Sequence, residues 1–582
     1  VLENGKNLKD QIMLHQAKTG LSIGKKNYQY ALEQVLSALE LLGEKPPQEV
    51  DLSKTVSHVI ENLSRQIHEK ENHSLLQPGH CTDKKTSDVM ILLCDLIKIS
   101  RLCKSKAYEE AATVRMMSIC LDSGYTSQYS TSFAHYGAIL MERALATDDL
   151  DLAKEGYRMG QISEKMARLK SLYGGHSLAI FHHYISHWRR TYRRSLGQIL
   201  SIYNAQLESG DYFHIPFTTF TYVQYHLASG HNLSKLDDNL QLFDALYQDY
   251  KMDNHWTTQL PQRFVSNLLG ETSDPFVLYG NTIEDQNARI DQMEKAGEND
   301  AVQLMHFLIL FNSVLFHNPE LSKSCLEKIK KENVSSIWKP WITFFQCFTD
   351  IVSLPTIEKK VEKRELEEII NRQRDQLLDW YDQGAVNCSF MVSLIDAEFM
   401  VTDSAGKKSV PSIRIKKFYD DAIAVAEEQE LTHMEGFCLE RASMRLEAVG
   451  AEELSAEYMG KAHDSYMEWN AIAKVDDLEE NHATKLQLAK HASMKMVGEN
   501  YVRQNRDMRY NPDRAIGGGR NLKTINIEKI AKKAGKVKKI ALGKSSGKSP
   551  RDAPKGAGTS PRASPRRQKF AISIKLGKNE KW

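Results

Sequence analysis

The residues of this chain whose types and spacing come closest to a metal site are His182, His183 and His187, in the run FHHYISHW. His183 and His187 are four residues apart, so on an α-helix they would share one face, as pairs of zinc ligands do. The glutamate of the zinc-protease motif is missing, and no third ligand is evident in the sequence. Because Tyr184 and Trp188 lie beside them, we predict that these histidines pack between helices and bind no metal.

A glycine-containing segment near the C-terminus is the nearest thing to a phosphate-binding loop. It reads Gly543-Lys-Ser-Ser-Gly547-Lys548-Ser549. A Walker A loop has four residues between its glycines and joins a strand to a helix. This segment has three, and both of its flanks are polar and of low complexity. We therefore reject nucleotide binding here and predict no cofactor.

The eight cysteines form no recognisable zinc or catalytic motif. None belongs to a Cys-x-x-Cys pair, and most lie in apolar helical patterns, so we expect reduced thiols that pack as small apolar side chains. His80 and Cys81 are adjacent after a Pro-Gly turn, whereas a nucleophile and its base converge from separate positions in the chain. The sequence thus predicts no catalytic residue, and the chain is not expected to be an enzyme.

The C-terminal tail carries the strongest charge signal. Residues 501–582 contain 23 Lys and Arg against 5 Asp and Glu, a net charge of +18, whereas the whole chain carries +2. The first 500 residues are correspondingly acidic, at −16. Low apolar content and high net charge predict that residues 497–582 are mostly disordered. Two basic clusters are expected to make the contacts of the tail: Lys532, Lys533, Lys536, Lys538 and Lys539, and then Arg562, Arg566 and Arg567.

Three roles for the tail stay open on the sequence. The tail could solubilise the chain, act as a nuclear import signal, or contact a polyanion such as nucleic acid or an anionic membrane. It lacks interleaved aromatic residues, so any binding to nucleic acid would be non-specific. Three serines that each precede a proline are candidate phosphorylation sites, and their added negative charge would weaken such binding: Ser549, Ser560 and Ser564.

The rest of the chain shows the apolar spacing of amphipathic helices. From Tyr28 to Leu42 apolar residues recur at intervals of three and four, and Gly43 marks the end of the helix. The same pattern returns at 88–102, 136–146, 152–169, 196–207 and 415–426, while strand-like alternation is scarce. The most apolar run, residues 306–317, is too short to cross a membrane. The sequence therefore predicts an all-α fold.

Helix starts recur near residues 107, 150 and 195, a period of roughly 40 residues that is typical of helix–turn–helix repeats. We predict an α-solenoid of tetratricopeptide-like hairpins, with a first part at 1–268, a polar connecting segment at 269–300, and a second part at 301–496. The basic tail, 497–582, follows. Gly156 and Gly160 form a GxxxG pattern, which predicts a close helix crossing.

Several stretches between residues 25 and 482 follow one another in an order that resembles a known family: Tyr136–Leu140, Gly156–Gly160, His187–Trp188, Leu207–Asp211, Tyr419–Ala426 and Tyr466–Val475. They are similar to the helical region of large multi-domain STAND/AAA ATPase–protein kinase signalling proteins, the multi-sensor signal transduction multi-kinase type. In that family the last stretch reads Tyr-x-x-Trp-Gly-Ala-x-Ala-Lys-Val, and Asn470 stands here where glycine is usual. The resemblance implies packing and turn roles for Tyr157, Trp188, Gly210, Tyr419, Ala422, Tyr466, Trp469 and Lys474.

The resemblance covers the helical region alone, and no catalytic residue of the family can be carried over. Because the chain begins with Val1, we expect a fragment whose ATPase or kinase domain lies upstream. The resemblance implies a non-catalytic scaffold that binds protein partners or regulates that enzyme, through the concave face of the array. The alternative is a stand-alone adaptor whose basic tail contacts nucleic acid or an anionic membrane. Either role predicts a cytoplasmic chain, or a nuclear one if the tail is an import signal, and no small-molecule substrate.

Overall fold

The structure is a computed structural model that describes residues 7–44, 49–147, 149–170, 174–252, 255–330, 334–403 and 410–491. The chain divides into two compact units, 1–500 and 501–582. The second unit, with all the candidate phosphorylation sites and basic clusters of the tail, lies outside the described residues. The predicted disorder of the tail therefore stays a prediction.

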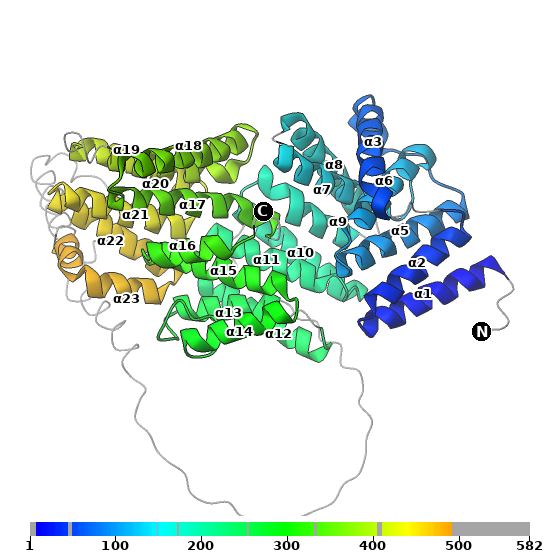
Figure 1. Cartoon of the computed structure of the whole chain (residues 1–582), viewed down its shortest axis with the longest axis horizontal. Coiled ribbons are helices and arrows are strands. Elements are labelled where there is room, and N and C mark those ends of the chain that lie inside the picture. The colour runs from blue at the N-terminus through cyan, green and yellow to red at the C-terminus, as the bar shows by residue number, and fades with distance from the viewer. Residues whose placement is uncertain are drawn as a thin grey trace, which may run out of the picture. The chain divides into compact units, whose positions relative to one another are not determined.

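The described part of the first unit is an α-solenoid, in which helices joined by short turns pack as successive hairpins (Figure 1). Besides helices it contains one isolated bridge, between His80 and Tyr125. The helices from the N-terminus to α11 are α1 (Leu8–Gly24), α2 (Tyr28–Leu41), α3 (Glu49–His68), α4 (Asn72–Leu76), α5 (Lys84–Leu102), α6 (Lys106–Ser123), α7 (Tyr129–Thr147), α8 (Leu150–Lys170), α9 (Gly174–Ile180), α10 (Tyr192–Ser209) and α11 (Ile215–Ser229). Those that follow are α12 (Leu233–Asp249), α13 (Trp256–Leu268), α14 (Ile283–Lys295), α15 (Asn299–Leu315), α16 (Pro319–Lys328), α17 (Lys339–Ser353), α18 (Lys360–Asp382), α19 (Ser389–Asp403), α20 (Ser412–Glu428), α21 (Thr432–Ala448), α22 (Glu452–Trp469) and α23 (Ile472–Asn481).

The two helices of a hairpin differ sharply in burial. In α15 every residue from Ala301 to Leu315 is buried, and such a helix must be covered on all sides. By contrast its hairpin partner α16 buries only Ser322 and Cys325. In the next hairpin α17 is largely buried, whereas α18 buries only four residues, at helical spacing on one face: Ile370, Gln373, Leu377 and Trp380. The array therefore has an inner row of enclosed helices and an outer row of amphipathic helices that face solvent.

The hairpins from α9 to α23 close on themselves. At the start of α12, Asn232 donates a hydrogen bond to the backbone carbonyl of Glu468 at the end of α22, over 3.1 Å. The Phe311 ring of α15 lies parallel to the His433 ring of α21, with centroids 5.9 Å apart. A Cβ on Gly230 would collide with that same His433 ring. These contacts join repeats that are far apart in the chain, whereas the repeats of an open solenoid contact only their neighbours.

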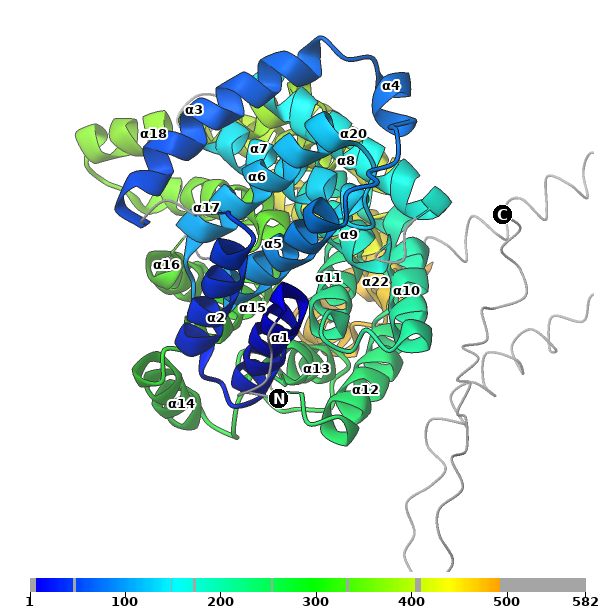
Figure 2. The ribbon, with the colours of Figure 1, turned by 90° about the vertical axis from the view of Figure 1, so that its right-hand side faces the viewer.

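Two large hydrophobic cores meet at α7 and α8. The first runs from Ile12 to Met166 and the second from Met141 to Leu486, so the α7–α8 hairpin belongs to both. We call α1–α8 the arm and α9–α23 the block. Figure 1 shows α2 between α1 and α5 in the arm, and Figure 2 shows the same three helices from the N-terminal side of the array. The segment 269–300 contains α14, whose Ile290 and Met293 pack into the second core.

The predicted close crossing is present. A Cβ on Gly156 of α8 would lie 3.0 Å from the carbonyl oxygen of Gly137 on α7, and a Cβ on Gly137 would lie 2.8 Å from the carbonyl oxygen of Gly156. The two backbones can approach this closely only because neither residue has a side chain. This contact fixes the hairpin that joins arm and block.

Candidate functional site

The first group of residues able to do chemistry is a buried ionic cluster centred on Glu440 of α21. Lys474 of α23 donates from Nζ to Glu440 Oε1 over 2.9 Å, and His317 Nε2 lies 2.8 Å from the same oxygen. Tyr466 of α22 donates to Glu440 Oε2 over 2.8 Å. The Lys474 and Glu440 side chains are 0% and 1% exposed. Burial alone would raise the pKa of Glu440, but the charge of Lys474 and its hydrogen bonds hold that pKa below its usual value.

A second buried cluster centres on Glu398 of α19. Arg441 of α21 donates from Nε and Nη2 to the two carboxylate oxygens, over 2.6 and 2.9 Å, which is the bidentate geometry of a strong pair. Arg445 adds a third bond from Nη2, over 2.7 Å. These cationic partners outweigh the effect of burial and lower the pKa of Glu398. Because Arg441 follows Glu440 directly, one turn of α21 holds both clusters.

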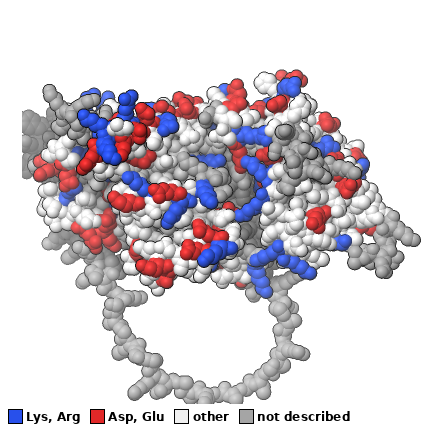
Figure 3. Space-filling model, viewed as in Figure 1, with Lys and Arg blue, Asp and Glu red and all other residues white. Residues whose placement is uncertain are grey.

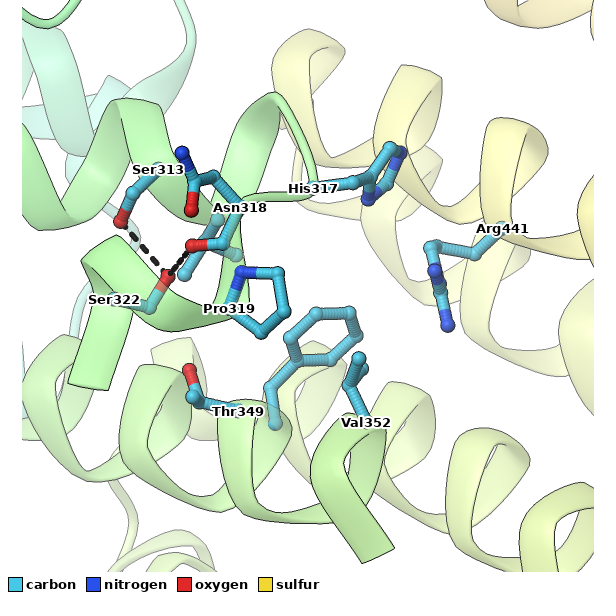
Figure 4. Close-up of a pocket in the computed structure, with 10 residues that line it drawn as sticks. Ser313, His317, Asn318, Pro319, Ser322, Thr349, Val352 and Arg441 are labelled. Atoms are coloured by element: carbon cyan, nitrogen blue, oxygen red, sulfur yellow. Dashed lines mark hydrogen bonds between the residues drawn. The ribbon is translucent and has the colours of Figure 1, made fainter. Parts of the chain in front are cut away.

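A small pocket opens beside this turn of α21, between α15, α16 and α17 (Figure 4). Its empty volume is about 260 Å³, part of which is open solvent. The Ser313 and Ser322 hydroxyls lie 2.8 Å apart and bond to each other. His317, the imidazole in the lining, is engaged by Glu440. Among the lining residues no base therefore faces a nucleophile, and the site has no acid–base or nucleophilic arrangement.

The residues matched by the family resemblance lie mainly at packing positions. Tyr466 and Lys474 meet at Glu440, and Tyr419 and Ala422 are fully buried in α20. Trp469 packs against His433 with ring centroids 5.2 Å apart, as an aromatic wedge between repeats. These positions join the last hairpins of the block into one core.

Three further matched residues lie at turns and at the arm–block junction. Trp188 packs edge-on against Trp380 of α18, with centroids 5.6 Å apart. Gly210 caps the C-terminus of α10 with φ 75°, as predicted for a helix stop. Asn470 ends α22 in the same left-handed conformation, with φ 68°. Asparagine tolerates this conformation better than most residues other than glycine, so it can serve as the cap at this position. Tyr157 of α8 lies under the guanidinium of Arg189.

The histidines of the FHHYISHW run occupy an irregular segment. Residues 181–185 form a π-helical turn and 186–188 a 3-10 turn, so the regular helix face assumed from the spacing is not formed. His182 bonds to Ser186 Oγ at 3.0 Å and His183 to Thr221 Oγ1 at 2.9 Å. Burial lowers the pKa of each of the three histidines to about 3. Across the described residues, no three His, Cys, Asp or Glu side chains are grouped as metal ligands.

Sequence reasoning missed Glu398, Glu440, Arg441 and His317. Glu398 lies in a mostly apolar helix, SFMVSLIDAEFM, that also carries the more exposed Asp396. A charge within such a helix is a signal for an ion pair, but the sequence does not say which of the two carboxylates is buried. His317 ends the most apolar run of the chain. Its pairing with Glu440, however, joins residues 123 positions apart, which local patterns cannot indicate.

One face of the block and arm carries mixed charge. In the face shown in Figure 3, Lys and Arg side chains alternate with Asp and Glu, and no broad field of one sign covers it. No helix of the described residues has the length and apolar character of a membrane span.

Comparisons with known proteins identify no family for this chain. No protein-family model and no curated protein matches the sequence. A solved structure titled "Circular tandem repeat protein with novel repeat topology and enhanced subunit contact surfaces" is similar over 85% of this chain and 99% of its own, at 10% identity and a TM-score of 0.17.

Proposed function

We propose that the chain is a non-catalytic helical-repeat scaffold that mediates protein–protein interaction or regulation within a larger signalling ATPase or kinase. One observation carries the proposal: the buried ionisable side chains of the block are used to join repeats to one another. Glu440 links α21, α22, α23 and the turn after α15, and Glu398 links α19 to α21. A fold that uses its buried charges for packing supports a structural role.

The closed block also bears on where a partner binds. Its inner helices are covered, so partners are expected on the outer amphipathic helices rather than in a concave groove. The longest of these, α18, has no buried residue from Lys360 to Ile369 and exposes Val361 to 69%. We expect this half of α18 to be a contact region.

The experiment that tests the scaffold role starts from the gene. The reading frame upstream of Val1 is sequenced, and ATP turnover of the complete protein is compared with that of a variant lacking residues 1–491. We expect an upstream ATPase or kinase domain whose turnover changes when the array is deleted. A start codon directly before Val1, or unchanged turnover, would contradict the regulatory role.

The charge of the tail favours a second candidate function, that of a stand-alone adaptor. A net charge of +18 over residues 501–582 is suited to non-specific contact with nucleic acid or an anionic membrane. Full-length chain is titrated with duplex DNA and with vesicles containing phosphatidylserine, and compared with a chain ending at residue 496. Binding that depends on salt and on the tail supports this role. Equal binding by both chains would refute it.

A further inference from the structure

Three buried histidines form a row that crosses from the arm to the block. His135 lies on α7, His176 on α9, and His214 directly before α11. The His135 and His176 ring centroids are 5.5 Å apart, and those of His176 and His214 are 3.8 Å apart. None of the three is more than 8% exposed. This histidine row lies where the two hydrophobic cores meet.

Charged groups flank both ends of the histidine row. At the α5 end, Arg101 Nη2 lies 3.2 Å from His135 Nδ1, and Arg101 is itself bound by Glu109 of α6 over 2.7 Å. At the other end, His214 Nδ1 lies 2.7 Å from Asp211 Oδ1. The other charged or titratable neighbours already have partners. Lys98 donates to Asp95, and the guanidinium of Arg101 lies over the Tyr184 ring. Glu164 of α8 accepts from Arg168 and Arg190.

The row has room for one added proton but not for two. A proton on His214 would be compensated in part by Asp211, although burial still lowers the pKa of His214. A second proton on His176 would then place two cations in rings only 3.8 Å apart, out of water and near Arg101. Burial and these cations lower the pKa of His135 and His176 well below the usual value. His176 Nδ1 and His214 Nε2 have no hydrogen-bond partner among the described residues, so no acceptor there would stabilise a second charge.

The packing around the histidine row is suited to movement. A small apolar cluster separate from the two large cores is formed by Ala134 and Ala138 of α7 and Ile180 of α9. It lies against Tyr184 of the π-helical turn and Phe217 of α11. The π-helical and 3-10 turns follow directly after α9. Irregular turns of this kind often mark positions where a helix changes direction in function.

We propose that the histidine row is a proton-operated joint: when His135 and His176 take up protons at acidic pH, α9 and α11 separate from α7, and the contact between arm and block loosens. The role does not depend on which partner the scaffold binds. It predicts a change in the arm–block contact at a pH where the rest of the block is still folded.

The test is hydrogen–deuterium exchange of the full chain at pH 7.5 and 5.5, corrected for intrinsic exchange at each pH. Consider a histidine that stays neutral while the joint is closed and titrates normally once the joint is open. Lowering the pH from 7.5 to 5.5 then raises the equilibrium constant for opening about 10-fold, and two such histidines raise it about 100-fold. We expect that change in α9 and α11. His176→Phe, which keeps an aromatic ring, should reduce it to about 10-fold, and the double variant His135→Gln/His176→Phe to a few-fold.

A matched control is His306→Phe, which removes a buried histidine of α15 whose pKa burial lowers to about 4 but which lies outside the row. It should leave the 100-fold change in α9 and α11 intact. If His176→Phe does not fold, His176→Gln takes its place. The joint is refuted if the double variant keeps the full pH dependence. It is also refuted if α9, α11 and α21 open together with one equilibrium constant, which would be global acid unfolding.

Discussion

Removing the cation of the Glu440 cluster should be among the most destabilising single changes in the block. In Lys474→Met the apolar stem of the side chain is kept and the ammonium is lost. Glu440 is then left buried with Tyr466 and His317 as its remaining partners. Breaking a buried pair by removing one partner typically costs about 3–5 kcal/mol, because an uncompensated charge stays out of water. His317 can recover part of that cost by taking up a proton.

The double variant Glu440→Gln/Lys474→Met tests the cause. If the loss comes from the unpaired charge, the double variant should regain most of it and lie within about 1–2 kcal/mol of the native chain. A matched control is Lys461→Met on α22, whose ion pair with Glu457 has the same kind of geometry, 2.7 Å, but is more than half exposed. An exposed pair of this type contributes less than about 1 kcal/mol.

The assay is urea unfolding of the full chain, with hydrogen exchange of α21–α23 as a local measure because long repeat arrays need not unfold in one step. We expect the exchange protection of α21–α23 to fall strongly in Lys474→Met and hardly at all in Lys461→Met. Equal effects of the two substitutions would show that Glu440 is not held by Lys474, and the reasoning would fail.

Three other outcomes are expected. Burial lowers the folded-state pKa of four histidines to about 3, so below about pH 6.5 the unfolded chain binds more protons than the folded chain: His182, His183, His187 and His433. The free energy of unfolding should therefore be highest above about pH 6.5 and should fall by roughly 2 kcal/mol per histidine by pH 5. Thermal melts recorded at a series of pH values measure this loss. Gly156→Ala should destabilise the chain by about 1–3 kcal/mol, because the added Cβ would collide with α7. Gly20→Ala should stabilise it by about 0.5–1 kcal/mol, because the added Cβ would meet nothing within 4 Å. The midpoints of urea unfolding distinguish the two variants, and the reverse order would be inconsistent with a close crossing at Gly156. Asn470→Ala should lower the melting temperature more than Asn470→Gly, because glycine adopts a φ of 68° without strain; equal effects would mean that the helix cap is not under conformational constraint.

The local part of the fold could be predicted from the sequence. Apolar spacing predicts helices at Tyr28–Leu42 and Ile415–Ala426, close to the observed α2 and α20. The prediction works because apolar residues recur every three or four positions along the buried face of a helix. The helix stop at Gly210 and the close approach at Gly156 were predictable for a similar reason. In each case glycine is the residue type that the local backbone requires, for a positive φ at Gly210 and for the close approach of two helices at Gly156.

The closure of the block and the histidine row could not be predicted in this way. The contact of Asn232 with Glu468 joins residues 236 positions apart, and no periodic pattern encodes such a pairing. Family resemblance pointed to Tyr466 and Lys474 as packing residues but gave no sign of Glu440 between them. His176 and His214 lie in different repeats, and the contact between their rings depends on how those repeats pack together.

The closure of the block also has a consequence for synthesis on the ribosome. Asn232 emerges about 236 residues before the carbonyl of Glu468 that completes its contact. At roughly 5–20 residues per second, α11–α13 wait on the order of 10–50 s with their inner faces uncovered. An open solenoid could bury each hairpin as the next one appears. This chain instead exposes apolar surface through much of its translation, so its nascent form should depend on chaperones more than its repeat architecture suggests.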